Sequence, residues 1–451
     1  MKNISFTSPE FTYLFSVTPD GKPQALPADN IPIMHWPDGT WCYEVNIYLF
    51  KKFQLGRSRR ARGGTLYTYA TQLSHIVGYC FNNRVDFSSI TDAHFTAFIT
   101  FLKGRRSSFS GQLSSSNTVL AIGRCTLDFL AAVALMHGQK YFIGEDGQIR
   151  AIRKTRLIKI ESTSRFISKQ YWDHASFPKP SPLKKIDAIT KASIDALILA
   201  ATNDTSSLFI RRRRYILIRL LEITGGRRDE IRNLTVNSVM AASEMESPKL
   251  RLITVKQGGN EVSERFVPIT MHDCKIILDF IEKSRLLVIR KTIGLRNDHG
   301  FVIVSETTGK QFAINTITQE VRNLKIMAGL ANRAHPHMFR HRFITKLFIS
   351  YIRHFSLTNR DEFRRRLLDT DFLKRKVMEL TGHRRSISLD RYIDPAFDEY
   401  FEIQQASAFI SSKSMTERAE LVSKLIADVK ADKPKEQIIS DLQMLELLVT
   451  V

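Results

Sequence analysis

The stretch TGGRRDEIRNL occupies residues 224–234, directly after a strongly apolar helical segment. Its paired glycines predict the end of one helix, and the residues behind them predict the start of another. Arg227 and Glu230 are three positions apart and share one helix face, while Ile231 and Leu234 supply the buried side. Arginine suits a phosphate because its planar fork donates two hydrogen bonds and stays charged. A surface arginine at a helix start remains the alternative for this segment taken alone.

A hairpin follows this stretch. The segments 250–256 and 264–269 are predicted strands that flank the glycine-containing turn 257–260. Glycines let a strand end approach a ligand closely, and here that end carries Lys256. An exposed turn lysine is the alternative.

The third segment is HPHMFRH, residues 335–341. Pro336 suits the first turn of a helix, and His337 and Arg340 then lie one turn apart on one face. Phe339 and Phe343 belong to the opposite, apolar stripe, so the polar pair is predicted to point away from the core. A hydrogen-bonded core histidine is the alternative.

The fourth segment is Leu380-Thr381-Gly382-His383, followed nine residues after the histidine by Tyr392. A tyrosine close to a helix end and shortly before a proline is normally structural. Only its place behind the other three segments singles it out.

In this order the four segments resemble the tyrosine recombinase (phage integrase) family. Residues 224–230 are similar to the family's TGxRxxE box, residues 337–341 to its HxxRH box, and residues 381–383 with Tyr392 to its Gly-His box and nucleophile. The resemblance covers about 186–400 by motif, and it reaches the helical region 65–138 by architecture only.

The resemblance implies that the chain cuts DNA with a tyrosine and forms a 3′-phosphotyrosyl link, which a 5′-hydroxyl then attacks. The bond energy is kept, so neither ATP nor a metal or other cofactor is expected. The residues carried over are the nucleophile Tyr392, the phosphate ligands Arg227 and Arg340, the proton-handling or hydrogen-bonding His337 and His383, the general acid Lys256 and the supporting Glu230.

Two other functions stay open. A type IB topoisomerase or hairpin telomere resolvase uses the same phosphotyrosine chemistry with a different second step. A sequence-specific DNA-binding protein with an inactive site is the non-enzymatic alternative, which the presence of all six catalytic residue types disfavours.

Charge supports a nucleic-acid partner. The 451 residues include 67 Lys and Arg against 45 Asp and Glu, a formal net charge of +22. Residues 1–50 and 401–451 are slightly acidic, so the excess lies in 51–400. Such a body attracts polyanions, nucleic acid first and an anionic membrane second.

A membrane location is disfavoured, since the longest apolar run, residues 129–136, is far shorter than the ~20 residues that span a bilayer. No secretory signal is visible. The four cysteines are far apart, which argues against disulfides or a zinc cluster and fits a reducing compartment. We expect a cytoplasmic, nucleoid-associated protein.

The predicted fold is mainly α with a small β-hairpin or sheet in the catalytic domain, an α+β protein whose two main domains form a C-shaped clamp on DNA. Residues 41–49 are predicted as a strand and 139–185 as less regular. The predicted domains are a short-stranded extension 1–50 of unknown role, a helical core-type DNA-binding domain 51–176, a proline-rich linker 177–185, the catalytic domain 186–400 and a helical tail 401–451.

Several basic residues are candidates for phosphate contacts, which give affinity rather than sequence preference. They are Arg57, Arg59, Arg60, Arg62, Arg211, Arg214 and Arg365. The last belongs to a segment between Arg340 and His383 that is longer than the family pattern. The resemblance also implies duplex DNA at specific sites, a tetramer on paired sites to which the tail contributes a protomer contact, accessory or host DNA-bending proteins, and a role in a mobile genetic element or transposition. The tail packing onto its own domain is the equal alternative.

Overall fold

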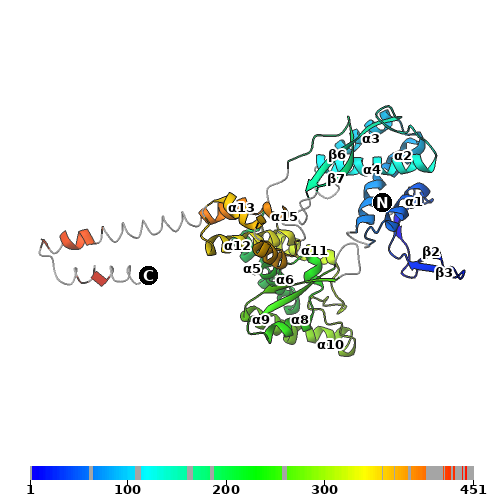
Figure 1. Ribbon diagram of the computed structural model, residues 1–451. Helices are drawn as coiled ribbons and strands as arrows, with labels where there is room; N and C mark the ends of the chain where they lie inside the picture. Colours follow the sequence, from blue (N-terminus) through cyan, green and yellow to red (C-terminus); the bar gives the residue numbers. More distant parts are fainter. Residues whose placement is uncertain are drawn as a thin grey trace. The chain divides into compact units, whose positions relative to one another are not determined.

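The computed structural model describes most of the chain up to residue 402 in two compact units (Figure 1). The first unit is formed by the chain up to residue 185, and the second by the rest, apart from the short stretch 255–262. The described residues are 3–59, 64–106, 113–159, 166–182, 187–255, 262–357, 359–369, 371–383 and 387–402, followed by 420, 422–427, 430–431, 439 and 442–443. The predicted tail therefore lies mostly outside them, and the predicted clamp remains a prediction.

The first unit begins with two small antiparallel strand pairs and continues with four helices. Strand β1 pairs with β4, and β2 pairs with β3. Their bounds are β1 Ile4–Phe6, β2 Thr12–Val17, β3 Pro23–Pro27, β4 Pro32–Met34, α1 Tyr43–Gln54, α2 Thr65–Asn83, the 3₁₀ turn Phe87–Ser89, α3 Asp92–Gly104 and α4 Ser116–Met136.

The strand predicted for residues 41–49 is wrong, because this segment forms the start of α1. Val45, Tyr48 and Leu49 are buried at helical spacing, and they share one core with residues of α2 and α4. Aromatic and β-branched composition favoured a strand, but the apolar face that the core could bury has the period of a helix.

Helix α4 is the central helix of the first unit. By length and composition alone it could cross a membrane, yet most of its apolar side chains are buried in the core, among them Phe129, Leu130 and Val133. A core helix explains the same composition.

Residues 139–185, predicted as less regular, contain a long two-stranded ribbon. Strand β6 (Ile149–Lys159) pairs antiparallel with β7 (Phe166–His174), and the short β5 (Ile143–Gly144) pairs parallel with the start of β6. The base of the ribbon is anchored by buried Ile149 and Trp172. His174 Nε2 lies 2.9 Å from Asp92 Oδ1 of α3, which ties the same end to the helices.

The second unit is mostly helical and contains one hairpin, β8 paired with β9. Its elements are α5 Lys191–Thr202, α6 Leu208–Thr224, α7 Arg228–Arg232, α8 Val236–Ser243, β8 Lys249–Val255, β9 Val262–Pro268, α9 Met271–Phe280, the π-helical turn Ile281–Arg285, α10 Leu286–Thr292, the 3₁₀ turn Leu295–Asn297, α11 Ile314–Met327, α12 Pro336–His354, α13 Arg360–Asp369, α14 Asp371–Thr381 and α15 Ile387–Asp390. Residues 393–402 are also helical.

Helix α12 joins the two apolar clusters of this unit. Its Met338 and Phe339 belong to the large core, which also holds apolar residues of α6. Its Phe348 and Ile352 belong to a second cluster that includes Tyr392. The predicted mainly helical α+β fold is confirmed. Helix α12 also contains the motif at residues 337–341 and packs into both cores.

Candidate active site

The first motif forms a tight turn between α6 and α7. Gly225 ends α6 with a left-handed backbone (φ 53°), and a Cβ on it would lie 2.6 Å from the side chain of Phe343. The hydroxyl oxygen of Thr224 accepts a hydrogen bond from the Gly226 amide at 3.0 Å. The turn thereby brings Arg227 to the N-cap position of α7.

Glu230 holds Arg227 in place from one turn along α7. Its Oε1 accepts from the Arg227 Nη1 at 2.8 Å, and its Oε2 accepts from the Arg227 backbone amide at 2.9 Å. Glu230 is only 1% exposed. Burial alone would raise its pKa, but the charges and hydrogen bonds of Arg265 and Arg227 outweigh burial and lower the pKa to about 2.

Arg265 on β9 also belongs to this cluster, although the sequence analysis assigned it no role. It is 4% exposed and donates from Nη2 to Glu230 Oε2 at 2.7 Å and from Nη1 to the Leu380 carbonyl at 2.5 Å. A signal was present in the strand period, since Arg265 alternates with exposed Phe266 and shares the inward face with Val267.

Arg340 lies within the protein rather than on the predicted outward face. It is 2% exposed, and its guanidinium donates to the carbonyls of Gly225, at 3.1 Å, and Thr381. Burial, with Arg227 and Arg265 nearby, lowers its pKa to about 9, so it stays charged at neutral pH. The predicted orientation holds for Phe339, for Phe343, which packs against the core, and for the exposed His337, but it is wrong for Arg340, which is buried against the carbonyls of Gly225 and Thr381.

The loop after α14 closes the cluster from the other side. Arg227 Nη2 donates to the Gly382 carbonyl at 2.9 Å, and Gly382 has a left-handed backbone (φ 62°). His383 Nδ1 lies 2.8 Å from the Thr381 hydroxyl oxygen. Burial and the charge of Arg340 lower the pKa of His383 to about 3, so its ring is neutral at physiological pH.

Tyr392 is buried in the second apolar cluster, with 2% exposure. Its hydroxyl lies 2.8 Å from His341 Nδ1, a partner that the sequence pattern contained but did not single out. Burial raises the pKa of Tyr392, partly offset by Arg391 and Arg340. Burial and the neighbouring His337 lower the pKa of His341 to about 4, so the pair is neutral near pH 7.

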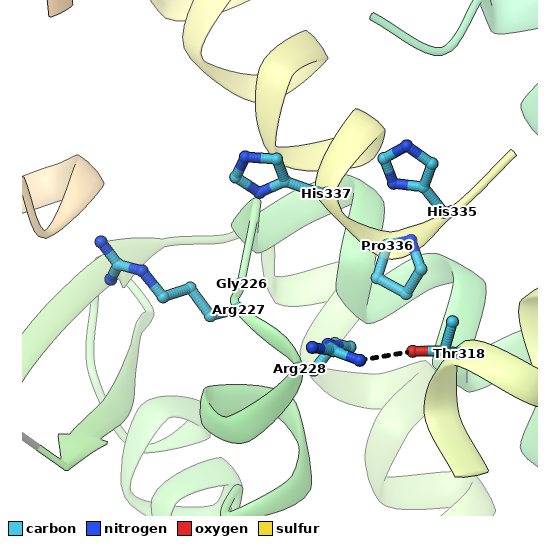
Figure 2. A pocket seen from close by; sticks show the side chains of 7 residues that line it. All are labelled: Gly226, Arg227, Arg228, Thr318, His335, Pro336 and His337. Atoms are coloured by element: carbon cyan, nitrogen blue, oxygen red, sulfur yellow. Dashed lines mark hydrogen bonds between the residues drawn. The ribbon is translucent and has the colours of Figure 1, made fainter. Parts of the chain in front are cut away.

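A pocket of about 460 Å³ opens beside these residues (Figure 2). Its walls are the segment Gly226–Arg228 and the first turn of α12, with His335 and His337, and Arg228 donates to the Thr318 hydroxyl at 2.9 Å. The start of a 19-residue helix adds partial positive charge. The His337 ring lies 4.3 Å, centre to centre, from that of His341, so rings connect the pocket to Tyr392. The arrangement suits a phosphate group.

One predicted catalytic residue, Lys256, lies outside the described residues, between β8 and β9. The other predicted residues Arg227, Glu230, His337, Arg340, His383 and Tyr392 all lie in the second unit.

The predicted DNA contacts on α6 are in different surroundings. Arg214 is paired with Asp204, and its Nε donates to Glu320 at 2.6 Å, with 11% of its side chain exposed. The structure therefore favours a structural role for Arg214 over the predicted phosphate contact, because two carboxylates neutralise it. Arg211 is half-buried, and its Nε has no hydrogen-bond partner among the described residues.

The remaining basic candidates also differ. Arg57 and Arg365 are exposed. Arg59 pairs with Asp29 at 3.0 Å, which favours a structural contact. Arg60 and Arg62 lie outside the described residues.

Comparison with known proteins gives a family match. Residues 188–352 match the model described as the phage integrase family. No curated protein matches the chain. Similar solved structures include a XerH site-specific recombinase bound to palindromic difH substrate (15% identity, 81% of this chain and 89% of that chain, TM-score 0.49), the Tn1549 transposon integrase with transposon right end DNA (13%, 79% and 98%, 0.42) and the XerA recombinase (15%, 80% and 98%, 0.33).

Proposed function

We propose that the chain, whose residues 188–352 match the phage integrase family model, is a tyrosine-type site-specific recombinase that cuts and rejoins DNA through a 3′-phosphotyrosyl intermediate on Tyr392. The observation that carries the proposal is convergence. Motifs more than 100 residues apart meet directly, as Arg340 donates to Gly225 and Arg227 donates to Gly382. The same cluster leads through His341 to Tyr392.

In the proposed reaction, the guanidinium groups of Arg227 and Arg340 bind the non-bridging oxygens of one phosphodiester. Negative charge grows on these oxygens as the phosphorus becomes five-coordinate, and fixed cations stabilise that state more than the ground state. Most of the hydrogen-bond partners of the two arginines are backbone carbonyls, so the positive charge is not cancelled. Glu230 positions Arg227.

Tyr392 supplies the nucleophilic oxygen. As its oxygen attacks phosphorus, the phenolic proton passes to the neutral His341, 2.8 Å away. Negative charge entering the pocket raises the proton affinity of His341 and of its neighbour His337. His337 and His383 hold the phosphate oxygens by hydrogen bonds.

The 5′-oxygen leaves as the P–O bond to it breaks, and it takes a proton from Lys256. A 5′-hydroxyl of a second strand then attacks the phosphotyrosyl link and releases Tyr392. One P–O bond replaces another at each step, so the cycle proceeds without ATP.

The test is covalent trapping on a nicked suicide duplex, built on a site that the full-length protein selects from a random-sequence pool. Wild type should form a protein–DNA adduct, and Tyr392→Phe should bind the same duplex without forming it. Tyr351→Phe is the matched control, since it removes a hydroxyl from a tyrosine packed on the same apolar cluster. An adduct that persists in Tyr392→Phe would eliminate the proposed nucleophile.

The substrate in this proposal is duplex DNA at specific sites, bound by a tetramer on paired sites in the cytoplasm, with transposition or integration of a mobile element as the setting. Relaxation of supercoiled DNA without strand exchange would indicate the topoisomerase alternative instead.

A further inference from the structure

The ribbon β6–β7 of the first unit plays no part in the chemistry above. Its register runs from Ala151 opposite His174 to Lys159 opposite Phe166. Among the ribbon residues whose side chains are described, Trp172 is the last buried one toward the tip, and its partner is Arg153. Six further pairs extend beyond this one, which corresponds to a projection of roughly 20 Å at about 3.3 Å per residue.

Apart from half-buried Tyr171, over whose ring Arg124 of α4 lies at 4.5 Å, the described side chains of the projecting part are exposed on both faces. On β6 every residue with a described side chain from Ile152 to Leu157 is exposed, as are Lys169 and Gln170 on β7. The outer part of the ribbon therefore has no layer of described residues packed over it, although an isolated strand pair is only marginally stable without one.

Its charge is almost of one sign. The two strands contain six basic residues and one acidic residue, Asp173, which pairs with Lys154 at 2.5 Å. The basic residues are Arg150, Arg153, Lys154, Arg156, Lys159 and Lys169.

Arg156 and Lys169 stand directly opposite each other in the register. Directly opposed like charges destabilise a strand pair. Among the described residues neither side chain is in a direct ion pair; burial raises the pKa of Asp128 in α4, and the charge of Lys169 is one of those that partly offset this rise. An anion between the two side chains would remove this repulsion, so the free ribbon carries a local cost that a polyanion relieves.

Protection of exposed strand edges is the alternative use of such charges. Charges of both signs would keep such an edge soluble equally well, and they would avoid a strong field of one sign. A protein partner would need an acidic surface of matching shape, whereas duplex DNA offers regular phosphates and a major groove about 12 Å wide that admits a two-stranded ribbon.

We propose that the ribbon β6–β7 is a DNA-binding arm that enters the major groove of duplex DNA, with the face of Arg156 and Lys169 toward the DNA. The inference rests on the proposed function only in taking DNA as the substrate. Arg153 is held by its stacking on Trp172, at 4.5 Å from the ring centre, and stiffens the base of the arm.

The first experiment measures binding of the full-length protein to a 40-bp duplex of arbitrary sequence between 50 and 200 mM salt. Arg156→Gln/Lys169→Gln should lower the slope of log affinity against log salt by about 2, at roughly 0.9 per phosphate contact. Affinity should fall about tenfold or more at 0.1 M salt. The control Arg290→Gln/Lys291→Gln removes two exposed cations from α10 and should have little effect. An unchanged slope in the ribbon variant, or an equal change in both variants, would overturn the inference.

The second experiment assigns the groove. The same proteins are titrated against a duplex whose cytosines carry glucosylated hydroxymethyl groups, which fill the major groove. The difference between wild type and the ribbon variant should shrink at least severalfold on this duplex. A difference of full size would exclude the major groove.

Failure of this inference is distinguishable from failure of the proposed function. Adduct formation by wild type together with normal binding by the ribbon variant would reject the arm alone. Duplex binding that depends on the ribbon, without any adduct on Tyr392, would reject the proposed chemistry alone.

Discussion

Two groups of arginines in the second unit look equally suited to phosphate in the sequence, but their partners differ. On α6, Arg213 and Arg214 share Glu320, and Arg214 also pairs with Asp204. In the second group, Arg227, Arg265 and Arg340, the first two share the carboxylate of Glu230, and all three donate to backbone carbonyls.

The charge balance follows from these partners. Two carboxylates neutralise the two α6 arginines, whereas Arg227, Arg265 and Arg340 exceed the single carboxylate of Glu230 by two positive charges. A carbonyl orients an arginine without cancelling its charge, so the partner type separates a structural arginine from one that can still bind an anion.

The largest expected effect concerns Arg340. Arg340→Gln should lower the single-turnover cleavage rate about 10²–10³-fold, as expected for the loss of one fixed donor to a developing oxyanion. DNA affinity should change far less, because many other contacts contribute to it. Quench-flow cleavage at saturating protein provides the measurement, and a near-normal rate would remove Arg340 from the site.

Arg214→Gln should lower the stability of the protein and leave its cleavage rate almost unchanged. It leaves Asp204 and part of Glu320 without a counter-charge, at a cost of about 3 kcal/mol in the free energy of unfolding. The cleavage rate of the folded protein should stay within about twofold of wild type. Urea unfolding and single-turnover cleavage on the same samples test both statements. A large loss of cleavage rate in a variant that stays stable would contradict a structural role for Arg214.

Arg265 provides a sharper test of charge balance. Arg265→Gln leaves Glu230 to Arg227 alone and should slow cleavage about tenfold, less than loss of a direct donor. Adding Glu230→Gln removes the excess carboxylate charge and should recover part of the rate. A purely structural role predicts that the double variant is slower still, with no recovery.

The smallest effect is a dependence of stability on pH. His341 has a folded-state pKa of about 4, lowered first by burial, against an ordinary value near 6.5. Between these values the unfolded chain binds the proton more readily, so this contribution is complete above pH 6.5 and is lost as the pH falls toward 4. From pH 7 to 5.5, wild type should lose about 1 kcal/mol more than His341→Gln. Equal slopes in urea unfolding would contradict the assigned pKa.

Local patterns predicted much of the site and little of its contacts. The order of the boxes located the turn at Gly225, the first turn of α12 and Tyr392. The order of the boxes did not reveal that Arg340 is buried or that His341 contacts Tyr392, because both depend on segments that lie 41 to 115 residues away in the sequence. Arg265 was not predicted, because the glycine-containing turn of the hairpin carries the recognisable signal and the inward face of β9 carries only the alternation of a strand.

In the first unit, side-chain composition was misleading where the burial period decided the structure. Residues 43–49 have strand-like composition and form a helix, whereas the exposed ribbon lacks a buried alternating pattern along its outer half. A strand pair held mainly by its own register has little hydrophobic signal to detect.

Tyr392 is both the proposed nucleophile and a core residue. Its ring contacts that of Phe348, and its hydroxyl is hydrogen-bonded to His341. Because Tyr392 is only 2% exposed, we expect a phosphate to reach its hydroxyl only when the surrounding segment opens, and the equilibrium constant of that opening would scale the cleavage rate. The packing around Phe348 and Phe363 would therefore limit how often the Tyr392 hydroxyl becomes accessible to DNA. Substitutions that loosen this packing should therefore raise the cleavage rate and lower discrimination between DNA sites, so we expect fidelity to depend in part on the hydrophobic core.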